Sequence, residues 1–192
     1  MWPWGHLALG YLCYAGYRWG THQRSPGGWP VLTLAFATQF PDLVDKPLAY
    51  WFRILPEGRA LTHSLLVVVP LCVILILVSQ RYQKTEHGVA FSIGLGSHLI
   101  GDALGPITNG AYGQASFLIW PLLPLPEYEA TNFLFHARKL GSLLLELNVQ
   151  RLMAPSSDMF VLEVWLSIAV LILWAIHGMP PMNRIRDWRL GT

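Results

Sequence analysis

Two apolar stretches, each about as long as a bilayer is thick, most constrain the fold of this chain. Ala60–Ser79 contains no acidic or basic residue, and Met159–Gly178 contains one carboxylate, Glu163. A transmembrane helix needs about 20 consecutive apolar residues. Only 12% of the 192 residues are charged, whereas soluble domains average about 25%. The chain is therefore predicted to fold with lipid as a large part of its solvent.

Three further stretches extend this pattern. Gly88–Pro106 is apolar but includes glycines and two polar side chains near its C-terminal end, and Pro3–Trp19 carries no charge before Arg18. Trp29–Pro41 is too short to cross comfortably unless it is tilted or extended toward Asp45. The predicted fold class is all-α, a polytopic membrane helical bundle of four to five membrane-embedded helices. Residues 1–180 are expected to form one membrane-embedded domain.

The long connector between residues 107 and 158 is expected to lie on the bundle surface. Ser116–Pro126 is apolar but broken by prolines, and proline inside a helix removes a backbone hydrogen bond, so a re-entrant or surface-lying piece is predicted. Phe133–Met153 repeats leucines at helical spacing with charges between them, which is typical of an amphipathic helix. Residues 181–192 form a basic tail that is predicted to be flexible.

Five alternating crossings would sort the chain between two membrane faces. Side A would hold the N-terminus, Asp42–Arg59 and residues 107–158, and side B the other chain segments. Short loops on the cytoplasmic face usually carry the excess of Lys and Arg. Basic residues on the short side B segments are Arg18, Arg24, Arg81, Lys84, Arg184, Arg186 and Arg189. The prediction is an integral protein of the cell (plasma) membrane, with a cytoplasmic C-terminal tail and a site near the opposite face. Lys46, Arg53 and Arg59 on side A run against this orientation.

The same sorting gathers metal-ligand side chains on side A. They are His6, Asp42, His63, His98 and Asp102. His98 and Asp102 are four residues apart, so they share one face of a helix, an arrangement by which one helix supplies two metal ligands. Ionisable groups inside a membrane are costly, which favours a functional cluster. The competing interpretation of His98 and Asp102 is a hydrogen-bonded pair that locks helix packing.

The other members of this cluster have simple alternative explanations too. Asp42 and Asp45 lie in Pro41–Pro47, where prolines on both sides favour a helix-terminating turn with solvated charges. His6, near a chain start, is typical of an interfacial histidine. Because a common side unites these residues, a buried divalent metal site is the hypothesis, with Zn²⁺ as first choice and Mn²⁺ or Fe²⁺ as alternatives.

Cationic and polar side chains near the predicted ligands suggest an anionic substrate. The guanidinium of Arg59 matches the oxygens of a phosphate group, although an interfacial arginine can also extend to lipid headgroups. Substrate binding is assigned to Lys46, Arg53, Arg59 and Thr62. As catalytic residues we expect Asp45 as general base and Arg59 as the group that neutralises developing charge.

Several short motifs in a fixed order resemble a known family. They are His6, Pro41–Asp42, Arg59 with Thr62–His63–Ser64, Ser97–His98 with Asp102, and Trp120–Pro121. This order resembles the LexA-regulated, membrane-bound metal-dependent hydrolases. It is also similar to the all-helical zinc-dependent phospholipase C and single-strand nuclease superfamily. That resemblance implies that Asp42, His63, His98 and Asp102 hold the principal metal, and that His6 helps to hold a second one beside Asp102.

The chain departs from these families at two motifs. Many members have Pro-Asp-x-Asp-His, but here the second carboxylate, Asp45, comes one residue later and is followed by Lys46. Many members also have His-Arg before Thr-His-Ser, but here Gly58 precedes Arg59. The resemblance therefore implies the same metal site, but with one ligand missing or replaced.

The function that these residues indicate is metal-dependent hydrolysis of a phosphoester on a lipid or lipid-linked substrate, by a metal-activated water. The alternative is a non-enzymatic membrane protein that uses the same polar cluster for ion, proton or metal transport. The expected partner is membrane lipid. A net charge of only +2 gives no reason to expect nucleic acid.

Overall fold

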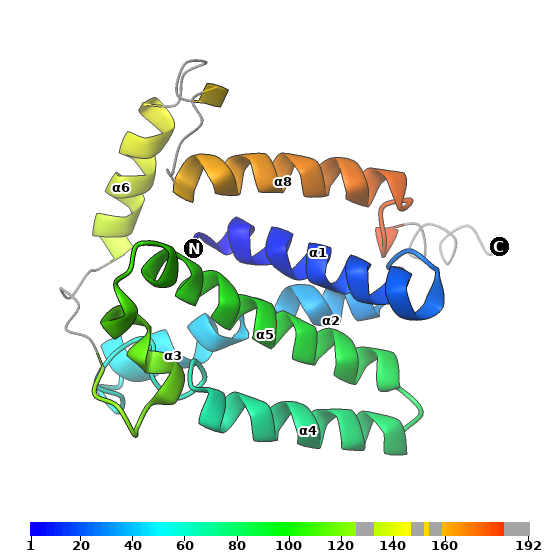
Figure 1. The fold of residues 1–192 in the computed structure, drawn as a ribbon, viewed down its shortest axis with the longest axis horizontal. Helices are drawn as coiled ribbons and strands as arrows, with labels where there is room; N and C mark the ends of the chain where they lie inside the picture. Colours follow the sequence, from blue (N-terminus) through cyan, green and yellow to red (C-terminus); the bar gives the residue numbers. More distant parts are fainter. Residues whose placement is uncertain (126–132, 147–151, 154–158, 183–192) are drawn as a thin grey trace.

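The computed structural model describes residues 1–125, 133–146, 152–153 and 159–182, and this part of the chain is helical, without a β-strand (Figure 1). The predicted all-α class is confirmed. The named elements are α1 (Pro3–His22), α2 (Pro30–Ala37), α3 (Phe40–Tyr50), α4 (Leu65–Arg81), α5 (Thr85–Thr108), the 3-10 helix η1 (Tyr112–Ile119), α6 (Phe133–Leu145) and α8 (Met159–Ile176).

The long helices lie side by side, and taken in chain order they run in alternating directions, so that the neighbours α1 and α8 are parallel (Figure 1). Helix α5 is central, because it packs against α1, α2 and α4, while α8 packs on α1. The N-terminus, α3 and η1 lie at one end of the bundle, which corresponds to side A. The turns between α1 and α2 and between α4 and α5 lie at the other end, side B. The helix directions agree with the alternation that the sequence predicts, whereas five membrane crossings remain a prediction.

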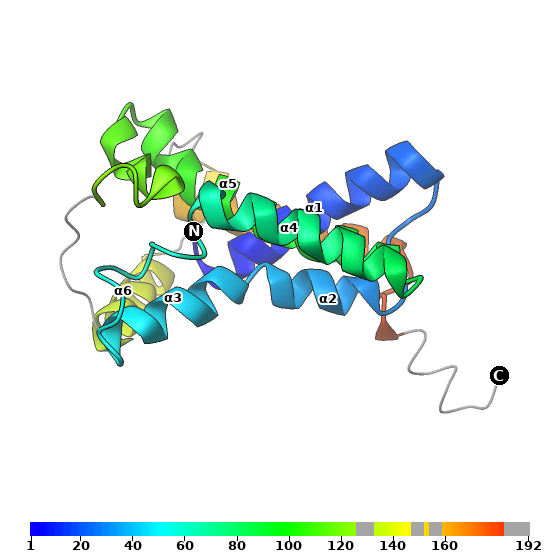
Figure 2. The same ribbon diagram turned by 90° about the horizontal axis from the view of Figure 1, so that it is seen from below.

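The second apolar stretch is a broken helix. Helix α3 continues the course of α2 toward side A after a break at Thr38 and Gln39 (Figure 2). Pro41 stands in the first turn of α3, where its missing N–H group is tolerated, whereas the same proline inside a continuous helix would remove a hydrogen bond. The break leaves the Thr38 carbonyl group available to a side chain, which becomes important at the site.

The first strong span begins later than predicted. Helix α4 starts at Leu65 and not at Ala60. The Ser64 hydroxyl caps it by accepting a hydrogen bond from the Leu66 N–H group at 3.2 Å. Ala60–His63 lie outside the helix because their polar groups bind the Asp45 carboxylate.

The outer faces of two helices are apolar and open. Large apolar side chains of α4, such as Val73, Ile74 and Leu77, and of α8, such as Leu171 and Ile172, are exposed. Within the described residues, α8 is the one helix whose length and apolar composition suffice to cross a membrane, and the apolar α4 is shorter. A continuous apolar exterior of this kind is typical of a surface that faces lipid. The fold is therefore all-helical with one helix of clear membrane length, and the four to five embedded helices remain a prediction.

The connector is only partly described. Its first part forms η1, which packs against α5 and α4 and buries Phe117 completely. The predicted helix Phe133–Met153 is present as α6, which ends at Leu145. Residues 126–132, 147–151 and 154–158, and the predicted tail from residue 183 on, lie outside the described part of the chain.

One glycine sets how closely α5 approaches α2. A Cβ atom at Gly94 would lie 2.6 Å from the Ala37 Cβ atom and 2.9 Å from the Leu34 carbonyl oxygen. We expect Gly94→Ala to lower the free energy of unfolding by about 1–3 kcal/mol, because the two helix backbones must separate.

Gly96, two residues along the same helix, is the matched control. A Cβ atom there would meet nothing within 4 Å, so Gly96→Ala is expected to stabilise the protein by up to about 1 kcal/mol through helix propensity. Thermal unfolding in detergent, followed by circular dichroism, measures both. Equal midpoints for the two variants would contradict close α2–α5 packing.

Candidate metal centre

The side A end of the bundle buries a group of ionisable side chains. His63, His98 and Asp45 are completely buried, and His6 and Asp102 are nearly so. They come from α1, α3, the loop before α4, and α5. Such groups are stable in an apolar bundle only when each has a polar partner.

Asp45 organises the loop that carries His63. Its carboxylate accepts hydrogen bonds from the Ala60 N–H group (2.9 Å), from the Thr62 N–H group (3.0 Å) and from the Thr62 hydroxyl group (2.8 Å). It also lies 2.8 Å from Nδ1 of His63. Asp42 to Lys46 lie within α3, so the predicted helix-terminating turn is wrong. The helix continues because its polar face is satisfied by this loop.

The electrostatics of this pair follow from its contacts. Burial by itself raises the pKa of Asp45, but the hydrogen bonds from His63 and Thr62 outweigh it and lower the pKa below its ordinary value. Burial by itself lowers the pKa of His63, but the neighbouring carboxylates of Asp42 and Asp45 reverse this and raise it. Asp45 is therefore ionised at neutral pH, and Nδ1 of His63 carries its proton toward it.

His98 is oriented by the helix break. Its Nδ1 lies 2.7 Å from the Thr38 carbonyl oxygen, which can only accept, so Nδ1–H donates. A neutral imidazole then presents a lone pair at Nε2. That Nε2 lies 3.1 Å from Nε2 of His63. Two ring nitrogens with their opposite sides held by acceptors thus converge on one point, which is how metal-binding histidines are usually oriented.

Two carboxylates face the same point. Oδ1 of Asp42 lies 3.6 Å from Nε2 of His63 and 4.0 Å from Nε2 of His98. Oδ2 of Asp102 lies 3.7 Å and 3.9 Å from the same two nitrogens. Burial raises the pKa of Asp42, but the neighbouring His63 imidazole and the Lys46 charge together hold it well below its ordinary value. An anionic Asp42 oxygen is thus available beside the imidazoles.

His6 extends the cluster toward α1. Its ring stacks on His98 with centroids 3.9 Å apart, and its Nε2 lies 3.3 Å from Oδ1 of Asp102. The ligand atoms form two overlapping groups, each within 4.8 Å: His6, His98 and Asp102, and Asp42, His63 and His98. The two groups share His98, whose one free ring nitrogen can bind a single ion.

The donor set fits a divalent metal of the zinc type. Imidazole nitrogens and carboxylate oxygens are the ligands that Zn²⁺, Mn²⁺ and Fe²⁺ share. Among the described residues, Oδ1 of Asp42 and Nδ1 of His6 are buried polar atoms without a hydrogen-bond partner. Buried polar atoms are seldom left unsatisfied, so the unpaired Asp42 oxygen, which faces both imidazoles, is what an ion would satisfy.

The predicted substrate residues are placed differently from one another. Nε of Arg59 lies 2.9 Å from Oδ2 of Asp102, and its guanidinium lies over the Phe117 ring, 5.8 Å from the centroid. Lys46 is half exposed and pairs with Asp42 at 2.6 Å. Thr62 is buried and holds Asp45, which gives it a positioning role in the structure. Arg53 is exposed and is not brought into the cluster.

Two supporting residues were not predicted for this site. Thr38 contributes only its backbone carbonyl group, which no side-chain pattern reveals. Glu163 of α8 is buried and accepts a hydrogen bond from the Trp2 N–H group at 2.9 Å. Its position inside an apolar stretch was a signal that it has a partner at this end. The amino group of Met1 also lies 2.8 Å from Oδ1 of Asp102.

The fold and this cluster together define a class, an all-helical protein with an apolar exterior and a buried His/Asp site at one end of its bundle. The sequence matches the family described as YdjM inner membrane protein over residues 1–180. The chain belongs to that family, and its membrane location is consistent with the prediction. No curated protein and no solved structure matches the chain, and nothing found supports a likeness to the phospholipase C and nuclease superfamily.

The two neighbouring aspartates should respond differently to amide substitution. Asp45→Asn places an NH₂ group against donors that now bind a carboxylate, and we expect it to lower the free energy of unfolding by about 2–4 kcal/mol. Asp42→Asn affects a partly exposed side chain whose main partner, Lys46, is half exposed, so a change within about 1 kcal/mol is expected. Thermal unfolding of the metal-free protein measures both, and the reverse order would contradict the assigned role of Asp45.

Proposed function

We propose that this protein is a membrane-bound, metal-dependent hydrolase that acts on a phosphoester of a lipid or lipid-linked substrate. The observation that carries the proposal is the convergence of the His63 and His98 Nε2 atoms, 3.1 Å apart, with carboxylate oxygens of Asp42 and Asp102 within 4.0 Å. A structural polar pair needs only two such groups. Here four groups of the type that binds metals converge, and the two imidazole rings are already held with Nε2 toward the common point. This arrangement favours a metal.

Asp42, His63, His98 and Asp102 would hold the principal ion, with His6 beside Asp102 for a second one. Such an ion, Zn²⁺ by first choice, lowers the pKa of water toward about 7 and polarises a phosphoryl oxygen. Asp45 and the Thr38 carbonyl group fix the two imidazole rings, so that little reorganisation is needed when substrate binds.

The roles of the charged residues follow from their exposure. Asp45 is completely buried and fully engaged by donors, so it serves better as the group that orients His63 than as the predicted general base. Asp42 is the carboxylate at the open side of the cluster, with an oxygen that lacks a partner among the described residues. That oxygen is the one an ion would satisfy, so we assign Asp42 to metal binding.

Arg59 and Lys46 would receive the anionic substrate. Arg59 contacts Asp102 and keeps about a third of its side chain exposed, and Lys46 is half exposed beside Asp42. Both cations therefore border the cluster from the solvent side. A guanidinium in this place can neutralise charge that develops on phosphoryl oxygens.

The surroundings of the cluster suit a lipid. Large apolar and aromatic side chains next to the loop are exposed, namely Tyr50, Trp51, Phe52 and Ile54. Aromatic side chains of this kind are enriched at the membrane–water interface. A substrate whose acyl chains stay in the bilayer could thus present its headgroup to the cluster without leaving the membrane.

A transport function would need polar groups through the depth of the bundle. Between the two ends, the buried core is formed largely by apolar and aromatic residues, including Ala8, Tyr11, Val31, Leu34 and Val170. A one-sided site therefore favours chemistry at the membrane surface over passage of an ion.

The proposal predicts a bound metal that depends on His98. Full-length protein purified in detergent without chelator should contain near-stoichiometric zinc or manganese by mass spectrometry. His98→Gln should reduce it below about a tenth of that amount, since the variant loses a nitrogen shared by both ligand groups. His22→Gln, an exposed histidine outside these groups, should leave it unchanged.

Hydrolysis is tested on the same preparations. We expect release of a phosphorylated or free headgroup from phospholipid vesicles by wild type and by His22→Gln, and at least about a hundredfold less by His98→Gln and Arg59→Gln. Arg59→Gln should keep its metal. A folded wild type that binds no metal would contradict the whole proposal, and metal without hydrolysis of any phosphoester would contradict the reaction.

A further inference from the structure

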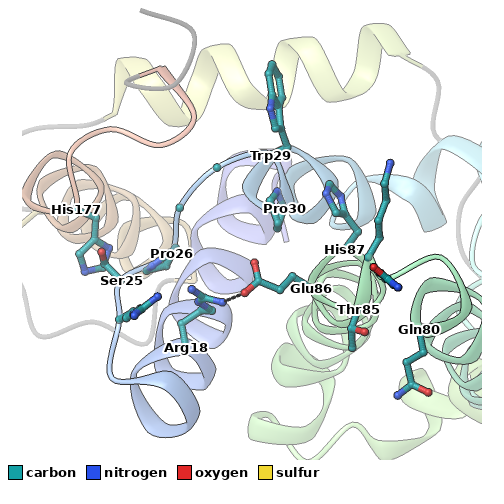
Figure 3. A pocket seen from close by; sticks show the side chains of 15 residues that line it. Arg18, Ser25, Pro26, Trp29, Pro30, Gln80, Thr85, Glu86, His87 and His177 are labelled. Carbon is teal, nitrogen blue, oxygen red and sulfur yellow. Dashed lines mark hydrogen bonds and ion pairs between the residues drawn. The ribbon is translucent and has the colours of Figure 1, made fainter. Parts of the chain in front are cut away.

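A second polar region lies at side B, the end of the bundle opposite the His/Asp cluster. It is a cleft of about 1020 Å³ between the α1–α2 connection, the turn from α4 to α5, and the end of α8. Figure 3 shows this cleft with Arg18 and Glu86 on its floor and Trp29, His87 and His177 around it. The function proposed above makes no use of it.

Cations dominate the charge of the cleft. Arg18, Arg24 and Lys84 line it, and Glu86 is its one lining carboxylate. Arg24 and Lys84 are exposed and make no side-chain hydrogen bond or ion pair with the described residues. Their charges are therefore available to a ligand, because they are not neutralised by ion pairs within the described part of the chain.

Arg18 does not use all of its hydrogen-bond donors within the described part of the chain. It is 91% buried and pairs with Glu86 through one terminal nitrogen, but its Nε is buried without a partner among the described residues. A buried guanidinium N–H group that finds no acceptor in the protein costs free energy. Arg18 lines the cleft, so an anion there would meet its guanidinium, whose planar fork matches phosphate geometry.

Two helices begin at this cleft. Helix α2 starts at Pro30 and α5 at Thr85, and neither N-terminus is capped by a side chain. Helix N-termini present free N–H groups and a partial positive charge, which together attract anions. At α2, Pro30 has no N–H group and the Leu32 and Thr33 N–H groups bond the Trp29 carbonyl oxygen, so this start adds mainly partial positive charge to the arginine and lysine side chains around the same space.

Two histidines complete the donor set. Nδ1 of His87 bonds the Thr33 hydroxyl group at 2.7 Å, and Nδ1 of His177 bonds the Tyr11 hydroxyl group at 2.9 Å. Within the described part of the chain, Nε2 of each ring has no partner. Both rings are thus held in fixed orientations at the cleft wall.

We propose that this cleft binds a phosphate-bearing anion at the membrane face opposite the His/Asp cluster. A phospholipid headgroup and a soluble phosphate compound present the same oxygens, so the chemistry of recognition is shared. The apolar outer surfaces of α4 and α8 would place a lipid headgroup at the level of the cleft, and basic groups there are attracted to anionic lipid. This inference does not depend on hydrolysis at side A.

Native mass spectrometry of the full-length protein in detergent tests the proposal. The probes are dioleoyl phosphatidic acid, dioleoylglycerol as the same lipid without phosphate, and inorganic phosphate as competitor. We expect wild type to retain phosphatidic acid and to bind dioleoylglycerol at least about tenfold more weakly. Arg24→Gln and Lys84→Gln should each weaken retention of phosphatidic acid by about tenfold, the worth of one charged hydrogen bond.

Arg81→Gln is the matched control, because Arg81 is an exposed cation at the end of α4, three residues before Lys84, and does not line the cleft. It should change retention by no more than about twofold. If inorganic phosphate displaces phosphatidic acid, the site recognises the phosphate group alone. If it does not, the site recognises the lipid. Equal retention by wild type and both cleft variants, or equal losses for Lys84→Gln and Arg81→Gln, would overturn the proposal.

Discussion

The carboxylate of Asp45 is the interaction on which the side A end depends. An ionised group with no solvent exposure survives in a protein only when hydrogen bonds replace its water. Asp45 meets this condition with donors from Ala60, Thr62 and His63. By doing so it fixes the loop before α4, the point where that helix starts, and the ring of His63. The candidate site therefore follows from the way one buried charge is satisfied.

Helix α5 links the two ends of the molecule. Near side A it carries His98 and Asp102, and it begins at side B beside Lys84 and Glu86. Between them it packs against α1, α2 and α4, closely enough at Gly94 that no side chain fits there. A rigid central helix of this kind holds the ligand atoms of the neighbouring helices at fixed distances, which a metal site needs.

Polarity in this protein is concentrated at the ends of an apolar bundle. Exposed apolar side chains on α4 and α8 and an apolar core leave the ionisable groups to the two ends of the bundle. At side A carboxylates and imidazoles converge, which suits a cation, and at side B arginine, lysine and helix N-termini converge, which suits an anion. The two regions thus differ in charge and in the chemistry of what they can bind.

The sequence by itself determined the helical class, the alternation of helices and the shared side of His6, Asp42, His63, His98 and Asp102, because hydropathy and helical spacing are local properties. It placed the start of α4 too early and allowed a turn at Asp42–Lys46, since the long-range hydrogen bond that the Ala60 N–H group donates to Asp45 decides both. Only the tertiary structure showed the Thr38 carbonyl group as a partner of His98, and the convergence of two Nε2 atoms. Distances between residues far apart in the chain depend on how helices pack, and no spacing in the sequence records that.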